Sequence, residues 1–184
     1  MLQTVIVLGV LLSGCAATAL RPSPHVRIWH DDRWSNGEVI VPASPEVVYA
    51  KLASLERWPE IFTYLARVEI LAEPGTIRTK SNGGQLRVLE LSRDPARRSI
   101  RIEEIGGRAP ASAVIEVHAA GPAHARVRAA LRARLSRALA WMIGSGRIRQ
   151  RCAAELLEEL TMVRDYFWRR AISSQIRDHQ LTSR

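Results

Sequence analysis

The chain has 184 residues, of which 47% are hydrophobic and 24% charged, a composition typical of a globular protein. This length suits one domain with extensions at its ends and argues against two full domains. The formal net charge is +9, and the 27 basic residues include only two lysines, Lys51 and Lys80. Two explanations of this arginine excess stay open: attraction to anionic lipid headgroups, and the codon usage of a GC-rich genome.

An apolar run over residues 5–12 is too short to span a membrane, which takes about 20 apolar residues, but fits the hydrophobic core of a signal peptide. It leads into Leu-Ser-Gly-Cys, ending at Cys15, which resembles the bacterial lipobox. This resemblance implies that residues 1–14 are a lipoprotein signal peptide, cleaved after Gly14, and that Cys15 is lipidated. No Lys or Arg precedes the apolar run, whereas signal peptides usually start with basic residues. An ordinary signal peptide or a short membrane-dipping end is the alternative.

Residues 15–33 are predicted to be a lipidated tether, because Pro22 and Pro24 stiffen the chain and a polar cluster follows them. Several acyl chains on one cysteine anchor a protein stably to a membrane. Ala16 and Ala17, rather than an aspartate, follow the cysteine. In a diderm host this pattern resembles outer-membrane sorting, so we expect a lipid-anchored protein of the cell envelope on the periplasmic face of the outer membrane.

Residues 34–178 are predicted to form one domain. Its first strand runs from Trp34 to Val41 and ends at a proline. A helix then begins with Ser44 as its cap and Pro45 in its first turn. A second short helix begins near Trp58, with apolar residues on its buried side.

Six strands follow, separated by turn signals that contain Gly, Pro or Asn. They are expected at residues 67–72, 76–80, 85–92, 99–105, 113–119 and 124–135. In the last of these, apolar residues alternate with arginines, which predicts a strand with one basic face. An alanine-rich helix is the competing interpretation of that segment.

The end of the domain is predicted to be one long helix over residues 147–176, because apolar residues recur in it every three or four positions. Three glutamates of this helix, Glu155, Glu158 and Glu159, lie at helical spacings from Arg151 and Arg164, which favours ion pairs along its surface. A cysteine in the same helix, Cys152, is expected to be a buried and inert thiol. Residues 179–184 are expected to be a flexible tail.

Two motifs of the N-terminal half are more specific than this order of elements. They are Val-Ile-Val-Pro-Ala-Ser-Pro-Glu-Val-Val-Tyr over residues 39–49 and Leu-Glu-Arg-Trp-Pro-Glu over residues 55–60. Together with the long C-terminal helix they resemble the START/Bet v 1-like superfamily, close to its polyketide cyclase/dehydrase and coenzyme Q-binding branches. The resemblance implies an α+β helix-grip fold, in which a curved antiparallel sheet wraps around the long helix.

The same resemblance implies an apolar cavity between sheet and helix, because members bind lipids, sterols, quinones or polyketides and some cyclise or dehydrate them. The candidate ligand-binding residues are Tyr49, Trp58, Phe62, Tyr64, Trp141 and Met142. The two tyrosines are equally explained as core or rim residues, and the tryptophan of the Trp-Pro motif as a structural wedge. The segment 141–144 is expected to be a hydrophobic lid, a membrane-touching loop or a loop packed on the domain.

No strong catalytic constellation, nucleotide motif or metal-ligand spacing is present, so no catalytic residue, metal or cofactor is predicted. His118 and His124 flank a turn and would suit acid–base chemistry if they faced each other, although surface histidines are the simpler interpretation. Five strand glutamates are expected at solvated positions: Glu69, Glu90, Glu103, Glu104 and Glu116. A row of arginines is interpreted as a solvated face or as a contact with anionic lipids: Arg126, Arg128, Arg132, Arg134 and Arg137.

Three functions agree with these observations. The first is a noncatalytic carrier or sensor of a hydrophobic small molecule at the cell envelope. The second is an enzyme of the cyclase/dehydratase type, which needs polar residues that converge inside the cavity. The third is an envelope interaction module whose cavity is filled by side chains. Export argues against nucleic-acid binding despite the basic charge.

Overall fold

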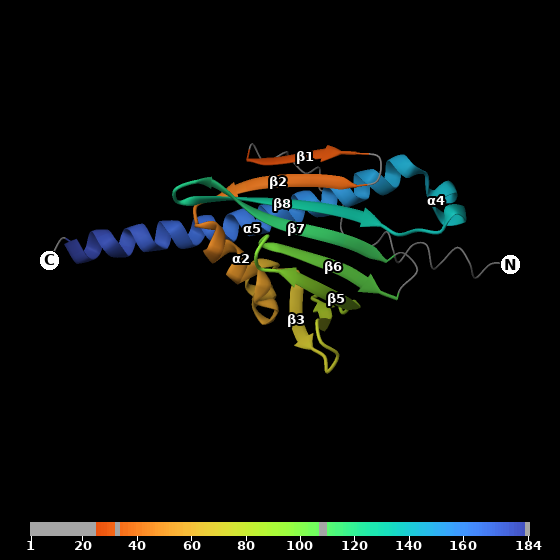
Figure 1. Cartoon of the computed structure of the whole chain (residues 1–184), viewed down its shortest axis with the longest axis horizontal. Helices are drawn as coiled ribbons and strands as arrows, with labels where there is room; N and C mark the ends of the chain where they lie inside the picture. The colour runs from red at the N-terminus through yellow and green to blue at the C-terminus, as the bar shows by residue number, and fades with distance from the viewer. Residues whose placement is uncertain (1–24, 32–33, 107–109, 183–184) are drawn as a thin grey trace.

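The computed structural model describes residues 25–31, 34–106 and 110–182, and confirms the helix-grip fold (Figure 1). Cys15, the signal peptide and most of the proposed tether lie outside the described residues. The elements in chain order are β1 (Val26–His30), β2 (Ser35–Val41), α2 (Pro45–Ala53), the 3-10 turn η1 (Leu55–Arg57), α3 (Trp58–Ile61), β3 (Leu65–Ile70), β4 (Thr76–Ser81), β5 (Leu86–Asp94), β6 (Ser99–Ile105), β7 (Ala111–Gly121), β8 (His124–Ala133), α4 (Arg137–Ile143) and α5 (Ser145–Thr182).

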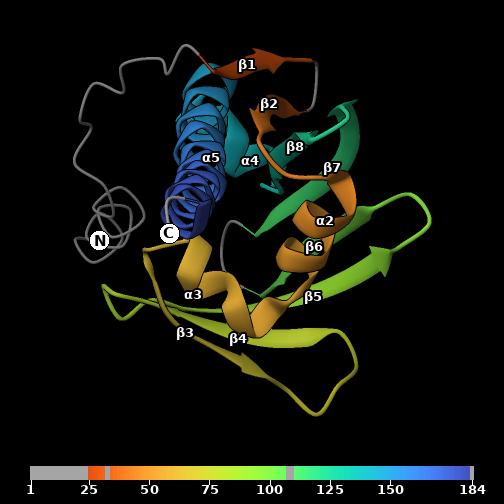
Figure 2. The same cartoon turned by 90° about the vertical axis from the view of Figure 1, so that its left-hand side faces the viewer.

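The eight strands form one antiparallel sheet in the order β1-β2-β8-β7-β6-β5-β4-β3. Strands β3 to β8 therefore pair with their neighbours in sequence, and β2 joins the sheet at the far edge of β8. Figure 2 shows the sheet curving from β1 to β3 around one side of α5, with α2 and α3 at one end. We call the face toward α5 the inner face and the opposite face the outer face.

Helix α5 packs on the inner face of β1, β2 and β8. Leu156 and Leu160 of the helix are nearly fully buried, as are Val39 and Val127 of the strands below it. The helix lies close to the sheet at Gly37, where a Cβ atom would lie 2.5 Å from Leu160 Cδ1. Burial of these aliphatic side chains supplies most of the driving force for the helix–sheet contact.

The predicted start of the first helix is confirmed. The Ser44 hydroxyl accepts a hydrogen bond from the Val47 amide at 3.4 Å, and Pro45 occupies the first turn. The indole of Trp58 donates from Nε1 to the Leu52 carbonyl at 2.8 Å. A buried indole N–H needs such a partner, so this tryptophan fastens η1 and α3 to the end of α2.

The structure differs from the sequence-based expectation at three places. Residues 26–30, which the sequence places in the tether, form β1, because each of them pairs with a residue of β2. The residues up to Thr182 continue α5, so the backbone of 179–182, which the sequence places in a tail, is helical. Residues 137–143 form α4, where a loop was expected. The predicted strand in the last of the six segments is confirmed at residues 124–133, which excludes the competing alanine-rich helix.

Candidate functional site

Five polar side chains from four parts of the chain gather on the inner face, between β5, β6 and α5. They are Tyr64, Arg87, Glu104, Glu155 and Glu159, and we call them the inner polar cluster. The strand register places Glu104 opposite Leu89 and Arg87 opposite Thr79, on the face that also carries the buried Leu91. Side chains alternate between the faces of a sheet, so both charged strand residues point toward α5.

Hydrogen bonds and ion pairs connect the cluster across the gap between sheet and helix. The Tyr64 hydroxyl donates to Glu159 Oε1 at 3.0 Å. The Arg87 guanidinium lies 3.7 Å from Glu155 Oε1 and 3.9 Å from Glu104 Oε1, and so holds one carboxylate of the helix and one of the sheet. The other oxygen of Glu104 accepts from the Ala111 amide at 3.1 Å. The cluster is therefore oriented by backbone as well as by side chains.

The surroundings of Glu159 favour its protonated form. Burial and, next, the nearby Glu155 carboxylate raise the pKa of Glu159 to about 7, although the Tyr64 hydrogen bond and Arg87 oppose this shift. The pKa of the Tyr64 hydroxyl is also raised, first by burial and then by the Glu159 charge. Near neutral pH the cluster thus contains one carboxyl that can donate or accept a proton, beside a phenol that keeps its proton.

Apolar side chains lie beside the cluster on the same face. Leu89, Ile102 and Ile115 of β5, β6 and β7 project toward α5 but are only partly buried. On the helix, Leu157 and Met162 are partly buried as well. Because α5 packs on β1, β2 and β8, it leaves this second half of the inner face incompletely covered. The inner face therefore combines an apolar surface with the polar cluster.

One predicted ligand-binding residue has an unusual environment. Tyr49 projects from α2 against the core, and its buried hydroxyl finds no hydrogen-bond partner among the described residues. An unsatisfied buried hydroxyl costs roughly 1–3 kcal/mol. A ligand with a polar group would remove that cost if it reached the Tyr49 hydroxyl.

The other predicted ligand-binding residues fall into two groups. Trp58 and Phe62 are buried, with their rings edge to face at 5.7 Å, and Tyr64 joins the inner polar cluster. Trp141 and Met142 lie apart from these, on α4 at the opposite end of the molecule from α2 (Figure 1). They are 85% and 67% exposed, so the structure does not bring them together with the residues of α2 and α3.

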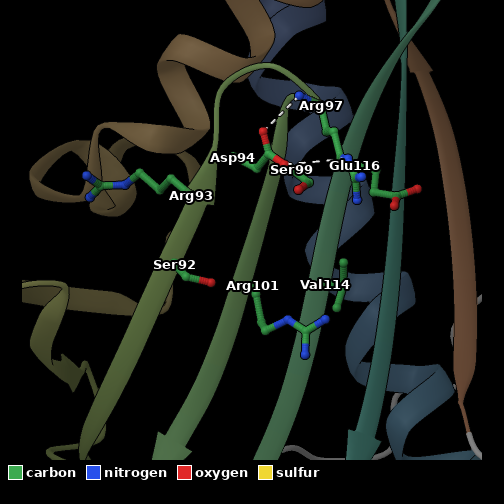
Figure 3. Close-up of a pocket in the computed structure, with 8 residues that line it drawn as sticks. All are labelled: Ser92, Arg93, Asp94, Arg97, Ser99, Arg101, Val114 and Glu116. Carbon is green, nitrogen blue, oxygen red and sulfur yellow. Dashed lines mark hydrogen bonds and ion pairs between the residues drawn. The ribbon is translucent and has the colours of Figure 1, made fainter.

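Two hollows lie on the outer face instead. The first, of about 280 Å³, is lined by Ser92, Arg93, Asp94, Arg97, Ser99, Arg101, Val114 and Glu116 (Figure 3). In it Arg97 pairs with Asp94 at 3.6 Å, while Arg101 extends over the strands. The second, of about 260 Å³, lies beside it over β2, β7 and β8. Both are polar and open, so neither is the apolar sheet–helix cavity that the resemblance implies.

The arginine row of β8 is largely engaged within the protein. Arg126 and Arg128 both reach Glu38, at 4.0 and 3.2 Å. Arg134 pairs with Glu103 at 3.3 Å. The Arg132 guanidinium stacks over the Trp34 ring, 4.5 Å from its centroid. The row is therefore partly neutralised, and its capacity for anionic lipid is smaller than the sequence pattern indicates.

The two histidines do not face each other. In the β7–β8 register His118 lies opposite Arg126, and His124 lies opposite Gly121 beside the turn. His118 Nε2 is 3.2 Å from Glu116 Oε2, and both side chains are about half exposed. Surface histidines, the simpler of the two interpretations, agree with this placement.

The cluster on α5 was not anticipated from the sequence. Glu155 pairs with Arg87 across the gap instead of with an arginine of its own helix, and Arg164 pairs with Asp165. Glu104 faces inward rather than toward solvent. The overlooked signal is the position of Glu159, three residues after Leu156 and therefore at the edge of the buried helix face.

Other chemistry finds no support in the part of the chain that the structure describes. No group of three or more metal-ligating side chains occurs there. No helix within the described ranges is long and apolar enough to cross a membrane. Cys152 is buried and unpaired, and burial raises the pKa of its thiol, which agrees with the predicted inert cysteine.

Residues 35–161 match the model of a family described as polyketide cyclase / dehydrase and lipid transport. The fold resembles that of the di-domain aromatase/cyclase BexL of the BE-7585A biosynthetic pathway, at 21% identity and a TM-score of 0.64. The aligned region covers 73% of this chain and 46% of BexL, so this chain spans about half the length of BexL. A START superfamily protein from Mycobacterium smegmatis is 18% identical over 71% of this chain and 93% of its own, with a TM-score of 0.59. The Zhui aromatase/cyclase from Streptomyces sp. R1128 is 19% identical over 80% and 96%, with a TM-score of 0.53. No curated protein matches the chain.

Proposed function

Because the chain belongs to the polyketide cyclase / dehydrase and lipid transport family, we propose that it binds or carries a hydrophobic small molecule on the inner face of its sheet. The ligand is a lipid, a quinone or a polyketide-like compound. It lies between α5 and the strands β5, β6 and β7, where the helix leaves the sheet incompletely covered.

The observation that carries this proposal is the partial burial of Leu89, Ile102 and Ile115, which face α5 without being closed off by it. Apolar surface that stays in contact with water costs free energy, so a ligand that covers it binds favourably. The unpartnered Tyr49 hydroxyl and the inner polar cluster offer polar contacts at the margins of this surface. Binding sites for small molecules commonly combine an apolar lining with a few placed polar groups.

Native mass spectrometry with lipid extraction tests the proposal. The full chain is purified from bacteria as a Cys15→Ser variant, so that its own acyl groups are not mistaken for cargo. A copurifying lipid or quinone is expected. Leu89→Gln should reduce the retained ligand about tenfold, since it removes apolar contact from the inner face. Val88→Gln, on the opposite face of the same strand, is the matched control and should behave like the parent. A chain that is empty and takes up no added lipid or quinone would favour an interaction module.

A second function, cyclase/dehydratase-type catalysis, is favoured by one specific observation. The inner polar cluster places a carboxyl with a pKa of about 7 within hydrogen-bond distance of a tyrosine hydroxyl. A general acid–base pair of this kind would shuttle the protons required by an aldol-type cyclisation or the loss of water, and typically contributes 10²–10⁴-fold in rate. In this proposal Glu159 transfers the proton and Tyr64 hydrogen-bonds the substrate carbonyl.

A poly-β-ketone thioester analogue, with mass-spectrometric detection of water loss, tests the catalytic proposal. Glu159→Gln should lower the rate about a hundredfold or more. Glu158→Gln, one residue away on the same helix, should leave it near that of the parent. If the parent chain does not accelerate water loss over the rate in buffer, the catalytic proposal is contradicted and the carrier function is favoured.

The envelope location is proposed on the lipobox-like sequence that ends at Cys15. The Cys15→Ser variant is expected to leave the membrane fraction when membranes are washed at high salt, because such a wash removes proteins held by charge but not those held by acyl chains. Full retention of Cys15→Ser after the wash would contradict lipidation.

A further inference from the structure

Helix α4 presents its largest apolar side chains to solvent. Trp141 and Met142 are 85% and 67% exposed, more than any other large hydrophobic residue that the structure describes. No residue of α4 is buried; Leu139 and Ile143 are partly covered, and α4 packs mainly against α5. Two adjacent large apolar side chains at the tip of a molecule indicate a surface that is covered in its working state.

The same end of the molecule carries an uncompensated positive charge. Residues 134–154, which include α4 and the start of α5, contain five arginines and no acidic residue. Arg134, directly after β8, makes the intramolecular contact described above. The other four make no ion pair with any part of the chain that the structure describes, and all are exposed: Arg137, Arg147, Arg149 and Arg151.

These arginines lie close to the exposed tip in the chain. α4 ends at Ile143 and α5 begins at Ser145, with Gly144 at a φ of +85° between them. Three of the four arginines follow within about the first two turns of α5. The nearby β1–β2 connection carries Asp31, whose carboxylate accepts hydrogen bonds from the Trp34 amide and the Asn36 side chain.

We propose that α4 and the first two turns of α5 form a docking surface for an anionic phospholipid bilayer. Trp141 and Met142 enter the interface between headgroups and acyl chains, where an indole ring is well placed with its apolar body in lipid and its N–H toward water. The arginines bind headgroup phosphates, for which a guanidinium fork is suited. Charge complementarity assigns the surface to anionic lipid, and it is separate from the inner face of the sheet.

An environment-sensitive label on α4 tests the docking directly. The full chain carries Cys15→Ser and Met142→Cys, and a nitrobenzoxadiazole group is attached at position 142; buried Cys152 stays, and a chain without the added cysteine gives its background. Vesicles with 30% phosphatidylglycerol in phosphatidylcholine are then added. The label emission is expected to shift to the blue and to rise, and the shift should diminish in pure phosphatidylcholine and at high salt.

The matched control carries the label at Ile172→Cys, a half-exposed position in the C-terminal part of α5. The C-terminal end of this helix extends past the sheet, on the side away from α4 (Figure 1). Little change is expected there. An unchanged emission at position 142, or equal changes at both positions, would overturn the proposal. A shift that needs no vesicles and grows with protein concentration would assign α4 to contact between copies of the chain, and would overturn it as well.

The charge component has its own test. Arg147→Gln combined with Arg149→Gln, with the label at position 142, should raise the lipid concentration for half-maximal shift about thirtyfold, because each basic residue near an anionic surface contributes to binding. Because both side chains are exposed, the variant is expected to fold like the parent. An unchanged half-maximal concentration would overturn the role of these arginines in docking.

Discussion

The two halves of the inner face follow the same alternation of side chains but end in different environments. Over β1, β2 and β8, α5 seals the sheet, and Val39, Ala125 and Val127 are 1% exposed or less. Over β5, β6 and β7, Ile100 and Val117 are buried as well, but Leu89 and Ile102 stay partly open and charged residues face the helix. One half thus holds the helix on the sheet, and the other carries the inner polar cluster and the partly exposed apolar side chains.

Helix α5 carries this asymmetry around its own circumference. Leu156, Leu160 and Val163 form the stripe that meets the sealed half. Glu155 and Glu159 lie on one flank of that stripe and meet Arg87 and Tyr64 on the open half. One face of α5 therefore packs in the core, and the adjacent face lines the candidate site.

The largest effect is expected in the sealed half. Leu160→Ala removes a side chain that is 2% exposed and leaves a space facing Gly37, so the free energy of unfolding should fall by about 3 kcal/mol. Urea denaturation followed by circular dichroism measures it. A loss below about 1 kcal/mol would contradict the sealed packing described for this half.

The second effect concerns the open half and depends on pH. Glu159 has a raised pKa of about 7 in the folded protein against 4.5 in the unfolded chain. The unfolded chain therefore releases this proton first, and stability falls as the pH rises from about 4.5 to 7, by at most about 3 kcal/mol. Glu159→Gln should remove this dependence and stabilise the protein above about pH 7 by roughly 1–3 kcal/mol.

The free energy of unfolding of this variant is measured across that pH range, with Glu158→Gln as the control. Equal pH profiles for the parent and Glu159→Gln would contradict the raised pKa of Glu159.

The smallest effect is expected at the apolar surface of the open half. Leu89→Ala takes away a side chain that is only partly buried, so the loss of stability should be about 1 kcal/mol, well below that of Leu160→Ala. The same denaturation experiment compares the two variants. A loss equal to that of Leu160→Ala would show that the two halves are equally packed.

The sequence predicts the fold better than the site. Ser44, Pro45 and the Trp58 motif act locally, through a cap, a fixed φ and a hydrogen bond to the preceding helix, so their roles can be predicted from neighbouring residues. The strands from β4 to β8 are likewise marked by their turns and their alternation. Strand β1 was overlooked because its pattern is short and its stability comes from pairing with β2.

The inner polar cluster could not be predicted in the same way. Its members come from the α3–β3 connection, two strands and a helix, and only the curvature of the sheet brings them together. Glu155 is separated from Arg87 by 68 positions, so no local spacing connects the two. Because α5 is rich in arginine, its own arginines are the expected ion-pair partners of its glutamates. In the folded protein Glu155 pairs with Arg87 of β5 instead.

The strand order also has a consequence for how the chain folds. Strands β3 to β8 form a run of hairpins that need only short loops, whereas β2 pairs with β8 across a span in which Val41 meets Ala125. Closing so long a loop costs conformational entropy before any contact rewards it. We therefore expect the hairpins to form early and the pairing of β2 with β8 to form late, which completes the part of the sheet on which α5 packs. The late pairing of β2 with β8 would then limit the rate of folding.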